Sequence, residues 1–151
     1  MDVDGIISAL TSMASASGKF DNVQGSEPKN APGAGVTGAF WFTALDPVQA
    51  MSGLASTSIR LVMTLRIYTP SVSEPADAID PQVISAAGAM FTALSGAFTL
   101  GGLVEEIDLL GAYGEPLSGR PGWLPFGDGV KYRTVDILIP IIVTDEYPQA
   151  A

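Results

Sequence analysis

Three carboxylates close together, Glu105, Glu106 and Asp108, are the first residues whose spacing could support chemistry. Carboxylate oxygens are the ligands that hard divalent cations prefer. A metal-dependent nuclease would also need further acidic residues, usually a lysine, and a positively charged groove for its substrate. The sequence shows no such combination of residues. The calcium-loop pattern of alternating Asp or Asn ending in Glu is absent too. We therefore interpret the cluster as charges on the solvent side of a strand and its turn, and we expect no metal site.

A glycine motif at 33–38 (GAGVTG) matches the G-x-G-x-x-G pattern of dinucleotide-binding proteins. That pattern binds a pyrophosphate only where a strand precedes it and a helix begins within it. Here Pro28 and Pro32 precede the motif, and the β-prone run 39–42 (AFWF) follows it. We interpret the match as accidental and expect no nucleotide cofactor.

The chain contains neither histidine nor cysteine. This composition removes the commonest general base at neutral pH, the thiolate nucleophile and the cysteine zinc site. Serine-based catalysis normally depends on a histidine or lysine partner. We therefore expect a protein without enzymatic activity, catalytic residues or cofactors.

Charged residues form only 15% of the 151-residue chain, against about a quarter in ordinary soluble domains. Sixteen acids and seven bases give a net charge of −9, and the bases form no run, so tight binding to nucleic acid is not expected. The start carries Asp2 and Asp4 where a signal peptide would be basic. The uncharged stretch 81–104 is too rich in small residues for a membrane span. With 47% hydrophobic residues and no linker or repeat, we expect a single domain over 1–151.

Helical periodicity predicts two helices, at about 3–17 and 80–98. The first would bury Ile6, Ile7, Leu10, Met13 and Ala14, and Gly18 would follow it with positive φ. In the second, Asp80 and Pro81 make a good start. Its predicted buried face comprises Val83, Ile84, Ala87, Met90, Phe91, Leu94 and Phe98, and its predicted outer face comprises Ser85, Ala86, Ala89, Thr92, Ala93 and Gly96.

An outer helix face without charge is unusual for a subunit that works alone, where that face should be wet and charged. Small residues there let another surface approach closely. We infer that this face is covered by copies of the same chain. Glutamate in place of Ala89 or Ala93 should then prevent assembly and leave the isolated fold mostly intact.

Strand patterns are clearest at 59–68 and 130–144, where apolar residues alternate with polar or mixed ones. Shorter strands are expected at 20–23, 37–45 and 104–110, and Pro140 should lie at a sheet edge or a bulge. Long loops are expected at 25–36, 46–57, 69–79 and 111–129. The predicted fold class is therefore α+β, a mostly antiparallel sheet of four to five strands covered on one face by two helices, in a ring-forming subunit.

Four further residues are candidates for a subunit interface. Trp123 and Phe126 lie in a Gly/Pro-rich segment, where burial is less automatic than in a strand, and interfaces favour aromatic side chains. Arg60 and Arg66 share the mixed face of one strand. Either they pair with surface acids of their own chain, or they pair across a subunit boundary and set its register.

Several short segments, spread over nearly the whole chain, carry a resemblance to a known family. They are Ser17-Gly18-Lys19-Phe20, Glu27-Pro28 with Ala31-Pro32-Gly33, Ser52-Gly53-Leu54-Ala55-Ser56-Thr57, Arg66-Ile67-Tyr68, Ala78-Ile79-Asp80-Pro81, Leu100-Gly101-Gly102-Leu103-Val104, Ile107-Asp108-Leu109-Leu110-Gly111, Tyr132-Arg133 and Val143-Thr144-Asp145. In these the chain resembles the tail terminator proteins of long-tailed (siphovirus-type) bacteriophages, especially actinobacterial ones.

The resemblance implies a small α+β subunit that forms a hexameric ring on the head-proximal end of the tail tube. There it would stop tube growth and present a surface to the neck or head-completion proteins, while DNA passes through the lumen without specific binding. Its location would be the virion tail, and the host cytoplasm during assembly. The family has no catalytic residues to transfer.

Two other interpretations stay open. A head-completion (neck) protein or a tail-tube subunit would share much of the same sequence pattern. A small-ligand binding module, with Met63, Met90 and aromatic residues lining a pocket between helices and sheet, is the alternative from a different class, although core packing is the commoner role of such residues.

Overall fold

Two long antiparallel strands form the centre of the fold, which we describe from a computed structural model that covers residues 1–72, 76–127 and 129–149. The α-helices are α1 (Val3–Ala16) and α2 (Ile79–Gly96), and short 3-10 turns lie at Gln49–Met51, Ala76–Ala78 and Leu100–Gly102. The strands are β1 (Asn22–Gln24), β2 (Thr37–Pro47), β3 (Ser56–Pro70), β4 (Glu106–Ile107), β5 (Ser118–Pro125) and β6 (Lys131–Pro148).

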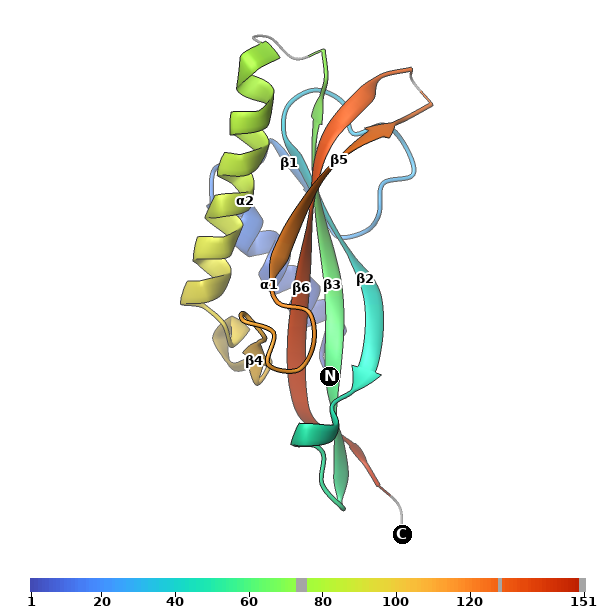
Figure 1. Cartoon of the computed structure of the whole chain (residues 1–151), viewed down its shortest axis with the longest axis vertical. Coiled ribbons are helices and arrows are strands. Elements are labelled where there is room, and N and C mark those ends of the chain that lie inside the picture. Colours follow the sequence, from blue (N-terminus) through green and yellow to red (C-terminus); the bar gives the residue numbers. More distant parts are fainter. Residues whose placement is uncertain (73–75, 128, 150–151) are drawn as a thin grey trace.

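Within the described residues these strands make one six-stranded sheet in the order β1-β2-β3-β6, with β4 and β5 both paired to the far side of β6. Only β1 and β2 run parallel; the other pairs are antiparallel. Figure 1 shows β3 and β6 running side by side along the long axis of the molecule. The predicted α+β class and mostly antiparallel sheet are confirmed, with one strand more than the four to five expected.

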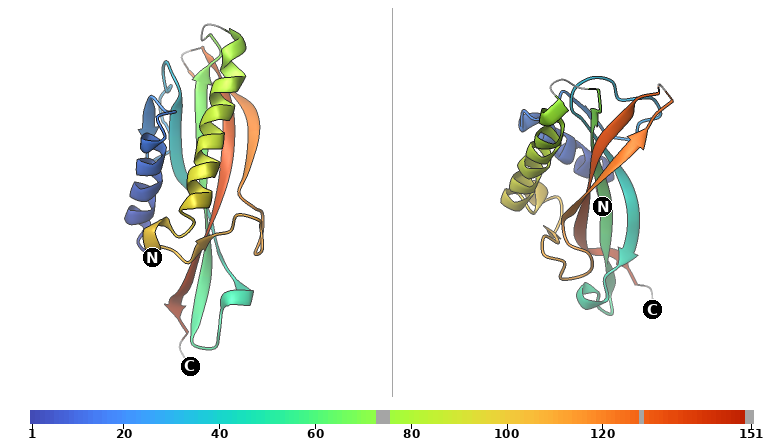
Figure 2. Two further views of the ribbon diagram at one scale, coloured as in Figure 1. Left: turned by 90° about the vertical axis from the view of Figure 1, so that its left-hand side faces the viewer. Right: turned by 45° about the horizontal axis from the view of Figure 1, so that its top comes forward.

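Both helices pack on the same face of this sheet, as predicted (Figure 2). The alternation in β3 and β6 supplies that face: Leu61, Met63, Leu65 and Ile67 from one strand, and Ile137, Ile139 and Ile141 from the other, are all buried. Each helix adds a stripe at helical spacing, Ile6, Leu10 and Ala14 from α1 and Val83, Ala87, Met90 and Leu94 from α2. The main core is this layer between helices and sheet.

The helix α1 begins and ends close to the predicted residues. The Asp2 side chain accepts a hydrogen bond from the Gly5 amide at 2.9 Å and caps the first turn. Gly18 follows the helix with φ of +72°, as predicted. Because glycine lacks a Cβ, it adopts this left-handed conformation without steric cost.

The helix α2 is rotated relative to the predicted orientation. Ala86, expected on the outer face, has no exposed surface, whereas Ile84 and Phe98, expected in the core, are 64% and 47% exposed. The buried stripe is centred on Val83, Ala87, Met90 and Leu94. Ile84, the residue after Val83, lies beside this stripe and faces solvent. Phe98 lies beyond the last helical residue. The helix also starts at Ile79 with Ala78 as its cap, so Asp80 belongs to the first turn.

The segment 104–129 differs most from the sequence prediction. Only Glu106–Ile107 of the expected strand 104–110 forms a strand, because Asp108 turns the chain by accepting the amides of Ala112 and Tyr113 at 2.7 and 3.0 Å. The expected loop 111–129 contains β5. Pro121 and Pro125 occur in it because β5 pairs with β6 on one side and can turn its other side to solvent.

Pro140 was expected at a sheet edge or a bulge, and the structure explains its place within β6. Its carbonyl accepts the Asp108 amide at 2.9 Å, so this residue directs its backbone polar groups away from β3. Along β6, pairing with β5 stops at Leu138, and pairing with β4 starts at Ile141. The missing amide of Pro140 therefore falls in a gap between two neighbouring strands.

Two expected loops are shorter than predicted because β2 and β3 extend further. The loop 46–57 is reduced to the turn between Pro47 and Ser56, and β3 runs on to Pro70. Residues 73–75 of the expected loop 69–79 lie outside the described residues. Phe42 lies two residues after the buried Phe40, so strand alternation places both on one side of β2, yet Phe42 is 55% exposed. It lies where β1 no longer flanks β2, next to a bulge in the β2–β3 pairing.

Candidate assembly surfaces

The sheet face opposite the helices carries a second, smaller cluster built on aromatic side chains. Tyr68 of β3 and Tyr132 of β6 are both 1% exposed. The ring of Phe126 meets them at centroid distances of 5.9 and 5.2 Å. The loop before β2 covers part of this cluster, since Ala31 packs on it and the Gly33 amide donates to the Tyr132 hydroxyl at 3.3 Å. Phe126, a candidate interface residue, is thus half-buried against its own chain.

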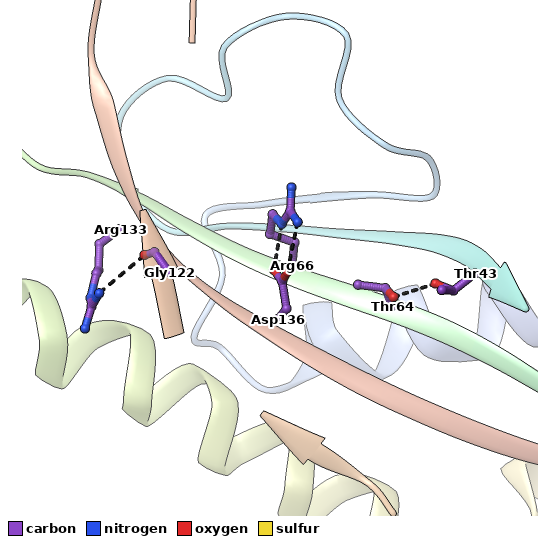
Figure 3. A network of polar contacts seen from close by, with 6 residues as sticks. All are labelled: Thr43, Thr64, Arg66, Gly122, Arg133 and Asp136. Atoms are coloured by element: carbon purple, nitrogen blue, oxygen red, sulfur yellow. Dashed lines mark hydrogen bonds and ion pairs between the residues drawn. The ribbon is translucent and has the colours of Figure 1, made fainter. Parts of the chain in front are cut away.

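Arg66 lies beside this aromatic cluster and makes a two-pronged ion pair (Figure 3). Its Nε and Nη2 donate to the two carboxylate oxygens of Asp136 at 2.6 and 2.8 Å. The two residues face each other directly across β3 and β6. The guanidinium also lies 5.2 Å from the Trp41 ring centroid, a cation–π distance. The hydrogen bonds with Asp136 raise the pKa of Arg66, so this arginine stays charged and is largely neutralised by its own chain.

Arg60 is held inside the subunit more tightly than Arg66. It is 9% exposed, its Nη2 donates to the Glu115 carbonyl, and its Nε lies 3.7 Å from the Asp108 carboxylate. An added Cβ at Gly114 would come within 2.7 Å of the guanidinium carbon, so this loop packs directly on the arginine. Arg60 therefore fixes the loop after β4 on the sheet, and its guanidinium is not available to a neighbouring subunit.

The outward side of α2 is exposed and carries no charge from Pro81 to Gly96. Its exposed residues are Pro81, Gln82, Ile84, Ser85, Gly88, Thr92, Ser95 and Gly96. Ala89 and Ala93, the two residues chosen as interface candidates, are half-buried at the edge of this surface. We call these eight exposed residues the α2 outer face.

Next to the α2 outer face, an apolar groove of about 410 Å³ separates α2 from β5 and β6. Val83, Ala87, Phe91, Gly119, Pro121 and Val135 line it, and Ile84 and Gly88 border it on the helix. Three side chains in series form its polar rim. The Asp80 carboxylate accepts a hydrogen bond from the Arg133 Nε at 2.9 Å, and the Arg133 guanidinium lies 4.7 Å from the centroid of the Trp123 ring. Trp123 is 53% exposed and is the candidate aromatic residue that stays open to solvent.

The sequence patterns do not predict this groove, although Ile84, a large aliphatic residue in an uncharged helix, is a signal for an exposed apolar surface. Helical periodicity predicts that Ile84 is buried in the core, and glycine and proline predict a loop at 111–129. Glycine and proline leave β5 without bulky side chains where α2 approaches it. Met63 and Met90, proposed to line a ligand pocket, have no exposed surface and pack in the main core.

The residues considered for chemistry do not converge. Glu105 is exposed, Glu106 is half-buried and Asp108 is buried as a turn acceptor; among the described residues no group of three or more acids is placed to hold a metal ion. The motif at 33–38 leads into β2, where a dinucleotide site would need a helix. Ser26 and Lys29 have the Ser-x-x-Lys spacing of some serine enzymes, but both are exposed in the loop before β2.

Comparison with protein-family models gave no match, and a search of curated proteins found no significant similarity. In the described part of the chain, no helix has the length and hydropathy needed to cross a membrane.

Proposed function

We propose that this chain is a structural subunit that assembles into a ring and caps the head-proximal end of a phage tail tube. The α2 outer face is the observation that carries the proposal: an eighteen-residue helix whose only charged residue, Asp80, lies in its first turn. Ordinary subunits place charged residues on such a face. A face without ionic groups loses little solvation when a neighbouring subunit covers it.

The charge distribution supports a lumen through which DNA passes without binding. Three arginines are offset by carboxylates of the same chain, in the pairs Arg60–Asp108, Arg66–Asp136 and Arg133–Asp80. With a net charge of −9, a ring of such subunits repels a DNA backbone. The tail terminator function itself rests on the sequence resemblance. The same resemblance implies the partners, which are a tail tube protein and a neck or head-completion protein.

Negative-stain images of the purified protein test this proposal. A terminator closes on itself, so we expect discrete rings of uniform diameter, with six subunits if the resemblance holds. A tail-tube subunit would extend into filaments, and a ligand-binding module would show separate small particles. Filaments or separate particles would contradict the terminator assignment.

A second test uses a phage that encodes the chain. If the ring stops tube growth, then particles assembled without it carry tubes of unequal length, because nothing ends polymerisation at the head-proximal end. Tubes of normal length joined to heads in its absence would show that another protein caps the tail.

A further inference from the structure

The turn between β2 and β3 presents one fully exposed leucine at the tip of a projecting hairpin. Leu54 is 99% exposed. Its surroundings, residues 47–59, contain no charged residue. Figure 1 shows this hairpin at one end of the long axis, beyond the helices. We call residues 48–55 the tip hairpin.

Hydrogen bonds within the chain hold the tip hairpin in a fixed shape. The Ser52 hydroxyl donates to the Val48 carbonyl at 2.6 Å and accepts the Ser58 amide at 3.0 Å. The Ser58 hydroxyl donates to the Met51 carbonyl at 2.7 Å. A leucine held out on a preorganised turn loses little conformational entropy when it docks, and this favours a role in binding.

The apolar groove between α2 and β5 is the matching concave surface on the same chain. The charges on its lining, Asp80 and Arg133, pair with each other, so the groove presents no net charge to an incoming segment. Each copy carries a net charge of −9, so contact between uncharged surfaces avoids the repulsion that acidic surfaces of two copies would cause. The tip hairpin and this groove are two such surfaces.

The hairpin and the groove lie in opposite halves of the molecule (Figures 1 and 2). One copy therefore cannot place its own Leu54 in its own groove. A contact between two different patches on identical subunits is heterologous, and such contacts close into rings when the rotation between subunits permits.

We infer that the groove between α2 and β5 receives the tip hairpin, with Leu54, of a neighbouring copy of this chain. This inference rests on the proposed ring and names the two surfaces that join its subunits. Ile84 and Trp123, both exposed at the groove, would then be covered in the assembly.

Two variants with matched controls test the contact. Leu54→Ser removes the apolar tip, and Leu110→Ser is its control, because Leu110 is also 94% exposed but lies on the loop after β4. Gly88→Leu fills the groove; an added Cβ there meets no atom within 4 Å, and leucine suits a helix better than glycine, so the fold is preserved. Gly88→Ala makes the same backbone change and leaves the groove open.

Solution mass by light scattering and thermal melting are measured for all four variants and the original chain. We expect association of L54S and G88L to weaken about tenfold or more, while L110S and G88A assemble normally. Every variant should still melt in one cooperative transition, because none of the substitutions changes the core, although loss of assembly can lower the melting temperature. Because the contact is heterologous, mixing L54S with G88L should restore one hairpin and one groove, so native mass spectrometry of the mixture should show one-to-one pairs.

Assembly of L54S and G88L like the original chain would overturn the hairpin–groove contact and leave the proposed ring standing. Loss of assembly without pairing in the mixture would also overturn it, since a heterologous contact must be complemented. An original chain that is monomeric throughout would overturn the ring and this contact together. An apolar dye that binds assembled G88A and not G88L, with assembly unaffected, would show that the groove stays open in the assembly and would refute the contact.

Discussion

The cross-strand pair Arg66–Asp136 is the clearest polar contact on the sheet face away from the helices. Both groups are partly exposed, with side-chain accessibilities of 22% and 38%, so solvent screens much of their attraction. A double-mutant cycle with alanine at each position should give a coupling free energy of about 0.5–1 kcal/mol in urea unfolding. A coupling near zero would mean that the guanidinium is held by its stacking on Trp41 and not by the carboxylate.

Burial raises the pKa of the Tyr68 phenol above its ordinary value near 10. As pH rises through 10, the unfolded chain releases the phenolic proton first, so the folded state holds more protons than the unfolded state. The free energy of unfolding should therefore fall with pH above about 10, and the fall should be smaller in Tyr68→Phe. Urea unfolding at pH 8, 10 and 11 measures both slopes; equal slopes would place the phenol in contact with solvent.

At the level of elements, the contact of α2 with the sheet depends on its rotated stripe. Met90→Ala removes a side chain with no exposed surface and should lower the free energy of unfolding by about 2–5 kcal/mol. In the separate subunit, Ile84→Ala changes an exposed side chain on the same helix and should alter the free energy of unfolding by no more than about 0.5 kcal/mol. If the two substitutions cost the same, then the orientation of α2 described above is wrong.

Periodicity alone could predict α1, β3 and β6, because apolar residues alternate with polar ones along the strands and recur every three or four residues in the helix. It could not predict the rotation of α2 about its axis, because alanine and glycine are common on all sides of this helix. Ala86 is buried and Ile84 is exposed, the reverse of what the periodicity predicts. It missed β5, since Gly119, Pro121 and Gly122 read as a turn; only pairing with β6 makes that segment extended. The groove forms where α2 and β5 approach each other in the fold, so no local sequence pattern marks it.

The candidate interface residues show the same limit. Arginine spacing identified Arg60 and Arg66 as neighbours on one strand face, and the structure confirms that placement. It could not identify their partners, because Glu115, Asp108 and Asp136 come from distant parts of the chain. Trp123 was singled out from its loop-like surroundings and is in fact exposed, although it lies in a strand.

For the whole molecule, the proposed ring depends on the α2 outer face being covered by a neighbouring subunit. Thr92→Glu tests this better than glutamate at Ala89 or Ala93, because Thr92 is exposed and the two alanines are half-buried. A charge there should prevent assembly, since covering it would remove a carboxylate from water without a partner. Thr92→Gln, a similar side chain without charge, is the matched control. Rings that form normally with glutamate at this position would exclude the α2 outer face from the interface.

The mass of the purified protein in solution is the most direct test of the whole account. Light scattering should give one discrete multiple of the 15.6 kDa subunit, six copies if the resemblance holds, with no further growth as concentration rises. A mass of 15.6 kDa at every concentration, with the α2 outer face open to water, would contradict the claim that this uncharged surface exists to be covered by its own copies.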